Sequence, residues 1–445
     1  MMNVNAAYAE KCVTPDEAVT LITSGSHLSM GMFAAEPPAL LNALAKRAKR
    51  GEINDLRVYC YETASIAGNT IFRYELSDYI HLYSMFITGI ERALIRQGIE
   101  SSGRKIVNYV PSNFHQATRL LADDIGIDTF IHTVSPMDKY GYFNFGTGND
   151  YSTRIARTAK KLIVEVNKYM PRVHGEGAAI HISEIDAIVE NHVPLIELPI
   201  RTAVAEDIAI SQIIASLVPD GACLQMGVGA LPELICNALK EHNDLGVHTE
   251  ALNPGLVSLI QQGVVTNQRK NIDRGMSVFT FAMGQKDMYD YLNDNPSFFS
   301  RPVDYVNDPG IIAQNENVVS INATLQIDLT GACNSEYLLG HQYSASGGQL
   351  DFVRGAYASK GGRSIITTRS TAANDTISRI VPRLEGPVTT PRTDTHWIVT
   401  EFGSVNLKGL SSTERALSII ELAHPNFRQQ LRVDAKKNAS DLKVG

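Results

Sequence analysis

Short β-rich runs alternate with longer segments of helical period along the whole chain, and this alternation is the feature that most constrains the fold. It is typical of α/β proteins, in which helices connect the strands of a mainly parallel sheet. In the first half a helix is expected after Glu36-Pro37-Pro38, because proline suits a first helical turn, and another over residues 113–125. The candidate strands of this half are residues 28–33, 56–61, 105–110, 130–134, 162–166 and 187–190.

The length predicts two domains. A chain of 445 residues exceeds the size at which one hydrophobic core usually keeps growing. Pro194 and Pro199 mark an interdomain linker over residues 192–204. We therefore expect two similar open α/β domains with mainly parallel sheets, at residues 1–191 and 205–445. The second is predicted to contain helices at 205–217 and 231–241 and strands at 222–226, 246–249, 278–282, 318–321, 325–329, 364–367 and 396–400.

The composition is that of an ordinary globular protein, with 44% hydrophobic and 20% charged residues. A net charge of -7 without a basic block argues against a nucleic-acid partner. The one dense basic run, residues 46–50, suits a solvated helix end. The N-terminus does not read as a signal peptide, and no run of about 18 apolar residues occurs. We expect a soluble, cytoplasmic protein that does not enter a membrane.

The cysteines indicate neither a metal site nor a disulfide framework. The five of them are scattered, without a CxxC pair and without a histidine at metal-ligand spacing: Cys12, Cys60, Cys223, Cys236 and Cys333. This pattern is typical of reduced thiols in a protein core. A cysteine-dependent, thiolase-like enzyme is disfavoured, because none of the five stands on a glycine loop near a histidine pair.

A glutamate, Glu250, ends the tetrad Val247-His248-Thr249-Glu250, at what the pattern predicts to be the end of a strand. Ligands of open α/β sheets bind at the carboxyl ends of strands, so the position suits a functional carboxylate. A helix cap or a solvated side chain is the alternative interpretation. If the carboxylate acts on an acyl group, Glu250 is a covalent nucleophile.

Two glycine loops flank this glutamate in the sequence. Gly227-Val228-Gly229 follows a candidate strand and opens a helix, where backbone N–H groups and the helix N-terminus favour an anion. The dinucleotide-binding fingerprint is not met, because the third glycine is missing. Gly347-Gly348-Gln349 forms a second turn whose amides could approach a ligand closely. A tight turn, for the first loop, and a hairpin or a strand-to-helix turn, for the second, are the alternatives.

Two other positions are ambiguous. Asn307-Asp308-Pro309 is first of all a turn initiator. His27 is a single histidine near a strand start, and it is a candidate pocket residue. The sequence around Asn307 and around His27 does not by itself indicate a catalytic or binding role for either residue.

Taken together, these segments resemble the acetyl-CoA hydrolase/transferase branch of the family I coenzyme A transferases, and its 4-hydroxybutyrate CoA-transferases in particular. The resemblance covers nearly the whole chain. Besides the segments at 227–229, 248–250 and 347–349, it rests on Ser135-Pro136-Met137-Asp138-Lys139-Tyr140-Gly141, Val399-Thr400-Glu401-Phe402-Gly403 and Ala423-His424-Pro425-Asn426-Phe427-Arg428.

The resemblance implies a role for each site residue. Glu250 matches the family's nucleophilic glutamate, and Asn307 and Gly348 match the side-chain and backbone donors of its oxyanion hole. Gly227, Val228 and Gly229, with Gly347 and Gln349, are expected to contact coenzyme A. His27, His341 and Gln342 are candidates for the pocket of the acceptor acid.

The implied reaction moves coenzyme A between an acyl-CoA (acetyl-, butyryl- or succinyl-CoA) and a small carboxylic acid such as 4-hydroxybutyrate or itaconate. The mechanism is ping-pong, through a glutamyl-CoA thioester. Acyl-CoA is a substrate, so no permanently bound cofactor and no metal is expected. A homodimer or higher homo-oligomer is implied. The alternatives are an acyl-CoA hydrolase of the same fold and a non-enzymatic acyl-CoA-binding sensor.

Overall fold

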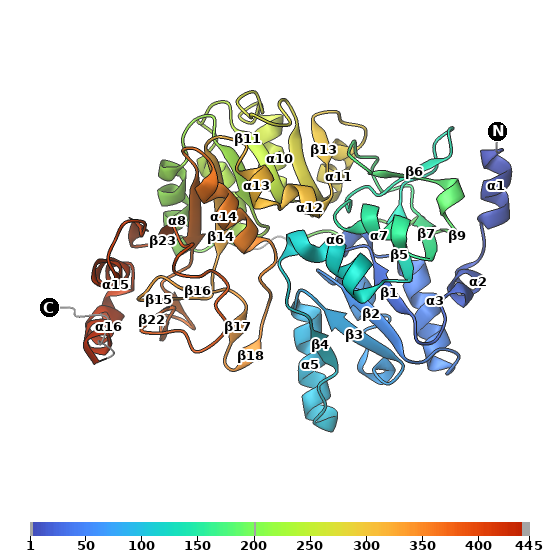
Figure 1. Cartoon of the computed structure of the whole chain (residues 1–445), viewed down its shortest axis with the longest axis horizontal. Helices are drawn as coiled ribbons and strands as arrows, with labels where there is room; N and C mark the ends of the chain where they lie inside the picture. The colour runs from blue at the N-terminus through green and yellow to red at the C-terminus, as the bar shows by residue number, and fades with distance from the viewer. Residues whose placement is uncertain (1–2, 200–201, 438–445) are drawn as a thin grey trace. The chain divides into compact units, whose positions relative to one another are not determined.

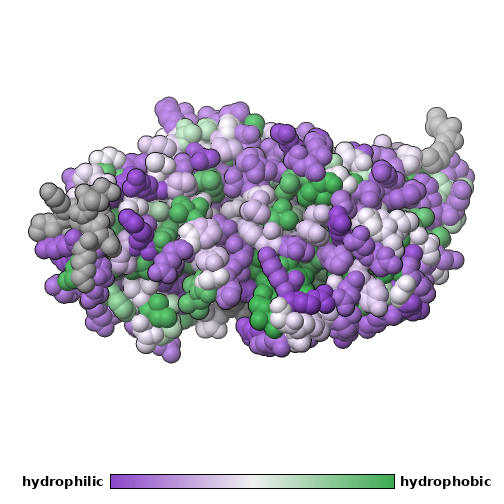
Figure 2. All heavy atoms as spheres, turned by 60° about the horizontal axis from the view of Figure 1, so that its bottom comes forward, coloured by the Kyte–Doolittle hydropathy of each residue, from purple (hydrophilic) through white to green (hydrophobic). Residues whose placement is uncertain are grey.

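The computed structural model describes residues 3–199 and 202–437, and it contains two compact units (Figure 1). Unit 1 comprises Met1–Leu198 and Val278–Tyr305, and unit 2 comprises Pro199–Ser277 and Val306–Gly445. Each unit contains a largely parallel sheet with helices, so the predicted α/β class is confirmed. No helix within the described ranges is long and apolar enough to cross a membrane. Hydrophilic side chains cover much of the face shown in Figure 2.

The sheet of unit 1 has seven strands in the order β4-β3-β2-β1-β5-β7-β9, and every neighbouring pair is parallel. The strands are β1 (His27–Met30), β2 (Leu56–Cys60), β3 (Ile80–Ser84), β4 (Val107–Tyr109), β5 (Thr129–Val134), β7 (Lys161–Val166) and β9 (Ala187–Glu190). The strands predicted from the sequence are confirmed within a few residues at their ends, and β3 was missed. Polar His81 and Ser84 interrupt the apolar residues of β3, which weakens its signal.

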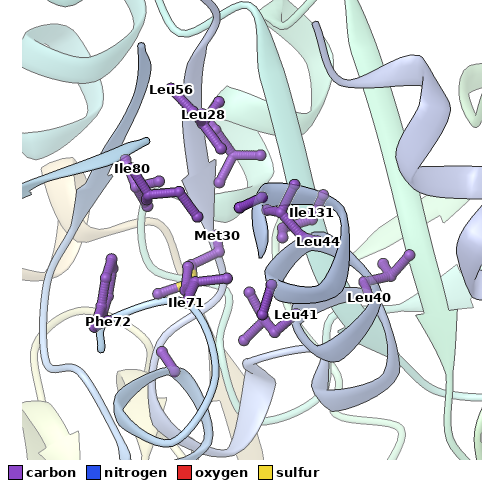
Figure 3. Packing of buried hydrophobic residues seen from close by; sticks show 14 of the residues in the cluster. Leu28, Met30, Leu40, Leu41, Leu44, Leu56, Ile71, Phe72, Ile80 and Ile131 are labelled. Carbon is purple, nitrogen blue, oxygen red and sulfur yellow. The ribbon is translucent and has the colours of Figure 1, made fainter. Parts of the chain in front are cut away.

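Helix α3 (Pro38–Lys49) begins at a proline, as predicted, and covers one face of this sheet. Its Leu40, Leu41 and Leu44 are fully buried and pack with Leu28 and Ile131 of the strands (Figure 3). The basic residues Lys46, Arg47 and Lys49 lie in its last turn, where positive charge is favourable.

One predicted helix of unit 1 is irregular. The helix predicted over residues 113–125 is not regular: a 3₁₀ turn (Phe114–Gln116), α6 (Ala117–Arg119) and a π-helix (Leu120–Ile125) follow one another. The remaining elements are α1 (Val4–Lys11), α2 (Pro15–Ala18), α4 (Ser65–Gly68), α5 (Gly89–Ser102), β6 (Tyr142–Asn144), α7 (Ser152–Thr158), β8 (Ala179–His181), α11 (Lys286–Leu292) and β13 (Phe298–Ser300), with most of β12 (Ser277–Ala282) and of α12 (Val303–Val306).

In unit 2 the strands run in the order β11-β10-β14-β19-β23-β24. They are β10 (Cys223–Met226), β11 (Gly246–Leu252), β14 (Val318–Ala323), β19 (Arg363–Thr367), β23 (Trp397–Thr400) and β24 (Gly403–Asn406). All these pairs are parallel except β23 with β24. The later strands β11 and β14 lie on opposite sides of β10, so the strand order reverses there. Open α/β sheets bind ligands at the carboxyl ends of strands at such a point.

Helices of unit 2 are α8 (Ala205–Leu217), α9 (Ala230–Ala238), α10 (Pro254–Gln261), α13 (Pro309–Ile312), α14 (Gln349–Ala358), α15 (Ser412–Glu421) and α16 (Pro425–Lys437). The strand predicted at residues 325–329 is β15 (Gln326–Asp328), and it belongs to a small sheet with β16 (Cys333–Asn334) and β22 (Ile380–Val381). Two hairpins complete the unit: β17 (Tyr337–Leu338) with β18 (His341–Gln342), and β20 (Thr371–Ala372) with β21 (Ile377–Ser378).

The compact units differ from the predicted domains in one segment. Residues 278–305, predicted as part of the second domain, group with unit 1. Backbone hydrogen bonds join Ala282 to Thr147 and Ser300 to His174, each at 2.8 Å. The predicted linker contains no helix or strand over residues 192–199, and its residues 200–201 lie outside the described part of the chain.

Candidate active site

Glu250 lies inside strand β11, and the prediction that it ends the strand is wrong. The strand continues to Leu252, because Ala251 and Leu252 are apolar and become buried. Glu250 is only half buried between two buried neighbours, Thr249 and Ala251. The strand therefore holds the backbone of Glu250 rigidly while its carboxylate keeps access to a ligand.

Asn307 and Gly348 meet this carboxylate within unit 2. The Asn307 amide Nδ2 donates a hydrogen bond of 2.6 Å to Glu250 Oε2. A Cβ atom added at Gly348 would lie 1.9 Å from Glu250 Oε2 and 2.2 Å from Asn307 Nδ2, so any side chain here would displace both groups. The three residues that the resemblance pointed to are thus brought together from three separate segments.

The local sequence explains how both donors are held. Asn307 is fully buried, and the next residue, Asp308, caps helix α13 by accepting hydrogen bonds from the N–H groups of Gly310 and Ile311. Gly348 is the N-cap of α14, so the positive end of that helix dipole is at the carboxylate. Negative charge is therefore favoured where Glu250 lies.

The first glycine loop follows β10 at the reversal of strand order. Gly229 has a φ of 124°, which an L side chain rarely adopts, and α9 starts at the next residue. Gly227, Val228 and Gly229 line a pocket of about 320 Å³ together with Asn322 and Arg369. This pocket belongs to unit 2 alone.

One side of the pocket carries an ion pair between Asp207 and Arg369. Asp207 of α8 accepts two hydrogen bonds from the Arg369 guanidinium, at 2.8 and 2.6 Å. This contact raises the pKa of Arg369 further, and the two side chains form an ion pair. The pocket offers amide groups and apolar side chains besides this ion pair.

The other residues of the second loop have structural contacts. Gly347 has a φ of 52° and makes the turn into α14. The side chain of Gln349 is buried and donates from Nε2 to Thr390 Oγ1 at 3.0 Å. That bond anchors the first turn of α14, which does not support the predicted contact of this side chain with coenzyme A.

The three acceptor-pocket candidates lie on other elements than Glu250, and their role stays a prediction. His341 is exposed in the β17–β18 hairpin, and Gln342 donates to Glu336 Oε2 at 3.0 Å and to the Ser344 carbonyl at 2.9 Å. His27 opens β1 in unit 1, at the amino end of a parallel strand, and its Nδ1 lies 3.1 Å from the Ile125 carbonyl oxygen. Ligands of such sheets bind at the opposite edge.

Two residues near the site were missed. His248 is buried and Nε2 lies 2.8 Å from the Val306 carbonyl oxygen, next to Asn307. Asn253 donates from Nδ2 to the Gly227 carbonyl at 2.7 Å and accepts from the Leu256 N–H. An asparagine three residues beyond a candidate glutamate, followed by Pro254, is a helix-cap signal that the sequence does contain.

Other nucleophiles and a metal centre find no support among the described residues. Burial raises the pKa of the Cys223 thiol to about 11 and that of Cys333 to about 12, and it also raises the pKa of Cys12, Cys60 and Cys236. A thiolate is therefore disfavoured at neutral pH. Residues 3–199 and 202–437 contain no group of three or more side chains of the metal-ligating types in a suitable cluster.

Comparison with known proteins decides the family. The model of the acetyl-CoA hydrolase/transferase N-terminal domain matches residues 1–197, and that of the acetyl-CoA hydrolase/transferase C-terminal domain matches residues 284–435. The chain belongs to the acetyl-CoA hydrolase/transferase family. The predicted resemblance is thereby confirmed.

Curated relatives of this family match over their full length. A succinyl-CoA:cyclohexane-1-carboxylate CoA transferase of Geobacter metallireducens is 41% identical over 97% of this chain and 96% of its own. A 4-hydroxybutyrate coenzyme A transferase of Clostridium kluyveri is 39% identical, over 97% and 98%. The crystal structure of RipA from Yersinia pestis is 76% identical, with a TM-score of 0.96 over 98% of this chain and 99% of that chain. The family member described here is an acyl-CoA:carboxylate CoA-transferase.

Proposed function

We propose that the enzyme transfers coenzyme A between a small aliphatic acyl-CoA and a small carboxylic acid, with Glu250 as the covalent nucleophile. The observation that carries the proposal is the contact of its carboxylate with the Asn307 amide and the Gly348 backbone. Succinyl-CoA, butyryl-CoA, acetate and 4-hydroxybutyrate occur in the names of full-length relatives. Acetyl-, butyryl- and succinyl-CoA are the proposed donors and 4-hydroxybutyrate is a proposed acceptor; itaconate is proposed from the sequence resemblance alone.

The first half of the reaction loads coenzyme A onto the enzyme. A Glu250 oxygen attacks the thioester carbonyl, and Asn307 Nδ2–H and the Gly348 N–H hold the resulting oxyanion. The coenzyme A thiolate leaves, which gives an acyl-glutamyl anhydride. The thiolate then attacks the glutamyl carbonyl, the first acid leaves as a carboxylate, and a glutamyl-CoA thioester remains.

The second half reverses these steps with the acceptor. Its carboxylate attacks the glutamyl thioester, thiolate leaves, and the thiolate attacks the acceptor's acyl carbonyl to form the new acyl-CoA. The Glu250 carboxylate is restored. The 2.6 Å bond from Asn307 to Glu250 Oε2 supports the steps on the glutamyl carbonyl, because that oxygen itself becomes the oxyanion.

A carboxylate is a weak nucleophile, so the rate must come from position and preorganised charge. Strand β11, the cap of α13 and the start of α14 each fix one of the three groups. Well-oriented intramolecular reactions gain as much as about 7–11 kcal/mol from position alone. The Glu250 site requires no metal in this scheme.

The pocket beside the first glycine loop is the proposed place for coenzyme A. Gly227 to Gly229 lie at the carboxyl end of β10, and the pocket is mainly lined by apolar and amide groups. Homo-oligomer formation and a cytoplasmic location stay predictions beside this proposal.

A panel of acids tests the proposed reaction. Acetyl-CoA or succinyl-CoA is incubated with acetate, butyrate, 4-hydroxybutyrate, succinate or itaconate, and the new acyl-CoA is measured by mass spectrometry. We expect transfer to at least one acid, with little free coenzyme A. Release of free coenzyme A at a rate that does not depend on an added acid would indicate the hydrolase instead.

A further inference from the structure

His248 is a buried polar side chain for which the proposed chemistry has no use. It is only 1% exposed. It precedes Glu250 by two residues on β11, and side chains two apart on a strand point to the same face. The imidazole and the Glu250 carboxylate therefore project from the same face of strand β11.

The imidazole is attached to the segment that carries the first oxyanion donor. Nε2 lies 2.8 Å from the carbonyl oxygen of Val306, the residue directly before Asn307. A carbonyl oxygen only accepts, so Nε2 carries the proton and donates. This bond ties the backbone of β11 to the backbone at Asn307.

The same ring packs on the helix that carries the second donor. The Phe352 and His248 rings meet edge to face, with centroids 6.4 Å apart and planes at 61°. The Phe352 N–H in turn donates to the Gly348 carbonyl at 3.1 Å. His248 thus contacts the segment before Asn307 and the helix that begins at Gly348, the two segments that lie against Glu250.

We propose that His248 is a positioning residue that holds Asn307, and through Phe352 also Gly348, at the geometry that the Glu250 reaction requires. This inference rests on the proposed function of Glu250. A buried histidine that only satisfies its own hydrogen bond is the alternative. The two interpretations differ in whether the effect of His248 passes through Asn307.

Three substitutions separate the hydrogen bond from the packing. His248→Gln keeps an N–H donor near the Nε2 position, whereas His248→Phe keeps a ring and loses the donor. His248→Asn has an amide too short to reach the Val306 carbonyl. We expect kcat to fall by about 10- to 100-fold in the Phe and Asn variants, because a small misplacement of a donor can cost as much as about 10²-fold. The Gln variant should stay within about threefold of wild type.

The decisive measurement is a double-mutant cycle with Asn307→Ala, with KM for acyl-CoA and Tm recorded for each variant. If His248 acts through Asn307, His248→Phe lowers kcat by less than about threefold in the Asn307→Ala background, with KM little changed. Additive losses in an enzyme that does transfer coenzyme A would overturn this inference alone. Equal kcat in wild type, His248→Phe and His248→Asn would do the same. A wild-type enzyme without acid-dependent transfer would overturn the proposed function and this inference with it.

Discussion

Glu250, Asn307 and Gly348 are far apart in the sequence, yet in unit 2 Asn307 donates a hydrogen bond to Glu250 and the Gly348 backbone lies against both side chains. Each has a different local reason to be there. The strand fixes Glu250, the capped turn fixes Asn307, and the absence of a side chain lets Gly348 approach. The site therefore depends on the absence of a Cβ atom at Gly348, which leaves space for the Glu250 and Asn307 side chains.

Gly348→Ala tests that dependence. The new Cβ would overlap Glu250 Oε2 and Asn307 Nδ2, which are the ends of side chains and can move aside. We therefore expect the fold to survive and kcat/KM to fall on the order of 10²–10³-fold, as when an oxyanion donor is lost. The control is Gly89→Ala, where the nearest neighbouring atom would lie 3.8 Å from the new Cβ. Wild-type kcat/KM in Gly348→Ala, with Tm unchanged, would contradict the account.

The sequence could identify these residues only through the family resemblance. Glu250 alone is compatible with a helix cap, and Asn307 alone is compatible with a turn initiator. His248 could not be identified as a contact of Val306, because that hydrogen bond spans 58 residues and exists only in the folded chain. His341 and Gln342 were proposed for the acceptor pocket because of their side-chain chemistry; Gln342 donates to Glu336 in the structure, and the role of both residues stays a prediction.

At the scale of elements, β10 and β11 with the helices that follow them build the edge of the site. Asn253 links the two strand ends, because its amide donates to the Gly227 carbonyl while its oxygen caps α10. One side chain therefore fixes both the glycine loop and the helix behind the nucleophile. The proposed coenzyme A contact of the loop depends on that link.

Asn253→Ser separates the two contacts. A serine can still cap α10, but it cannot reach the Gly227 carbonyl as the amide does. Loss of one hydrogen bond is worth about 0.5–1.5 kcal/mol, so we expect KM for acyl-CoA to rise by about three- to tenfold with Tm nearly unchanged. Asn253→Ala should lower Tm as well, because the cap is lost. An unchanged KM for acyl-CoA in both variants would show that the Asn253–Gly227 hydrogen bond does not contribute to acyl-CoA binding.

Regular elements were predictable where local signals agree. The sequence pattern identifies α8 and β9 with their observed bounds, because helical period or a β-branched run coincides with clear breaks. It fails at residues 113–125, where helical residues form 3₁₀ and π turns in place of one helix. The pattern also predicts an end of β11 at residue 249, whereas the strand continues to Leu252, because the burial of Leu252 depends on neighbours distant in the sequence.

At the scale of the whole molecule, the chain leaves unit 1 at Leu198 and returns to it for residues 278–305. A linear pattern of strands and helices cannot show this return, because it depends on backbone hydrogen bonds between distant segments such as Ser300 and His174. The α/β class was predictable from the alternation of strands and helices. All three proposed catalytic groups nevertheless belong to unit 2.

The covalent role of Glu250 is the central claim, and chemical trapping tests it most directly. The enzyme is incubated with acyl-CoA, treated with hydroxylamine or borohydride, and mapped by peptide mass spectrometry. Modification is expected at Glu250 alone, because only a glutamyl thioester or anhydride reacts. Glu250→Ala should show neither modification nor transfer, whereas the exposed control Glu241→Ala should show both. Modification of another residue, or wild-type turnover in Glu250→Ala, would contradict the account.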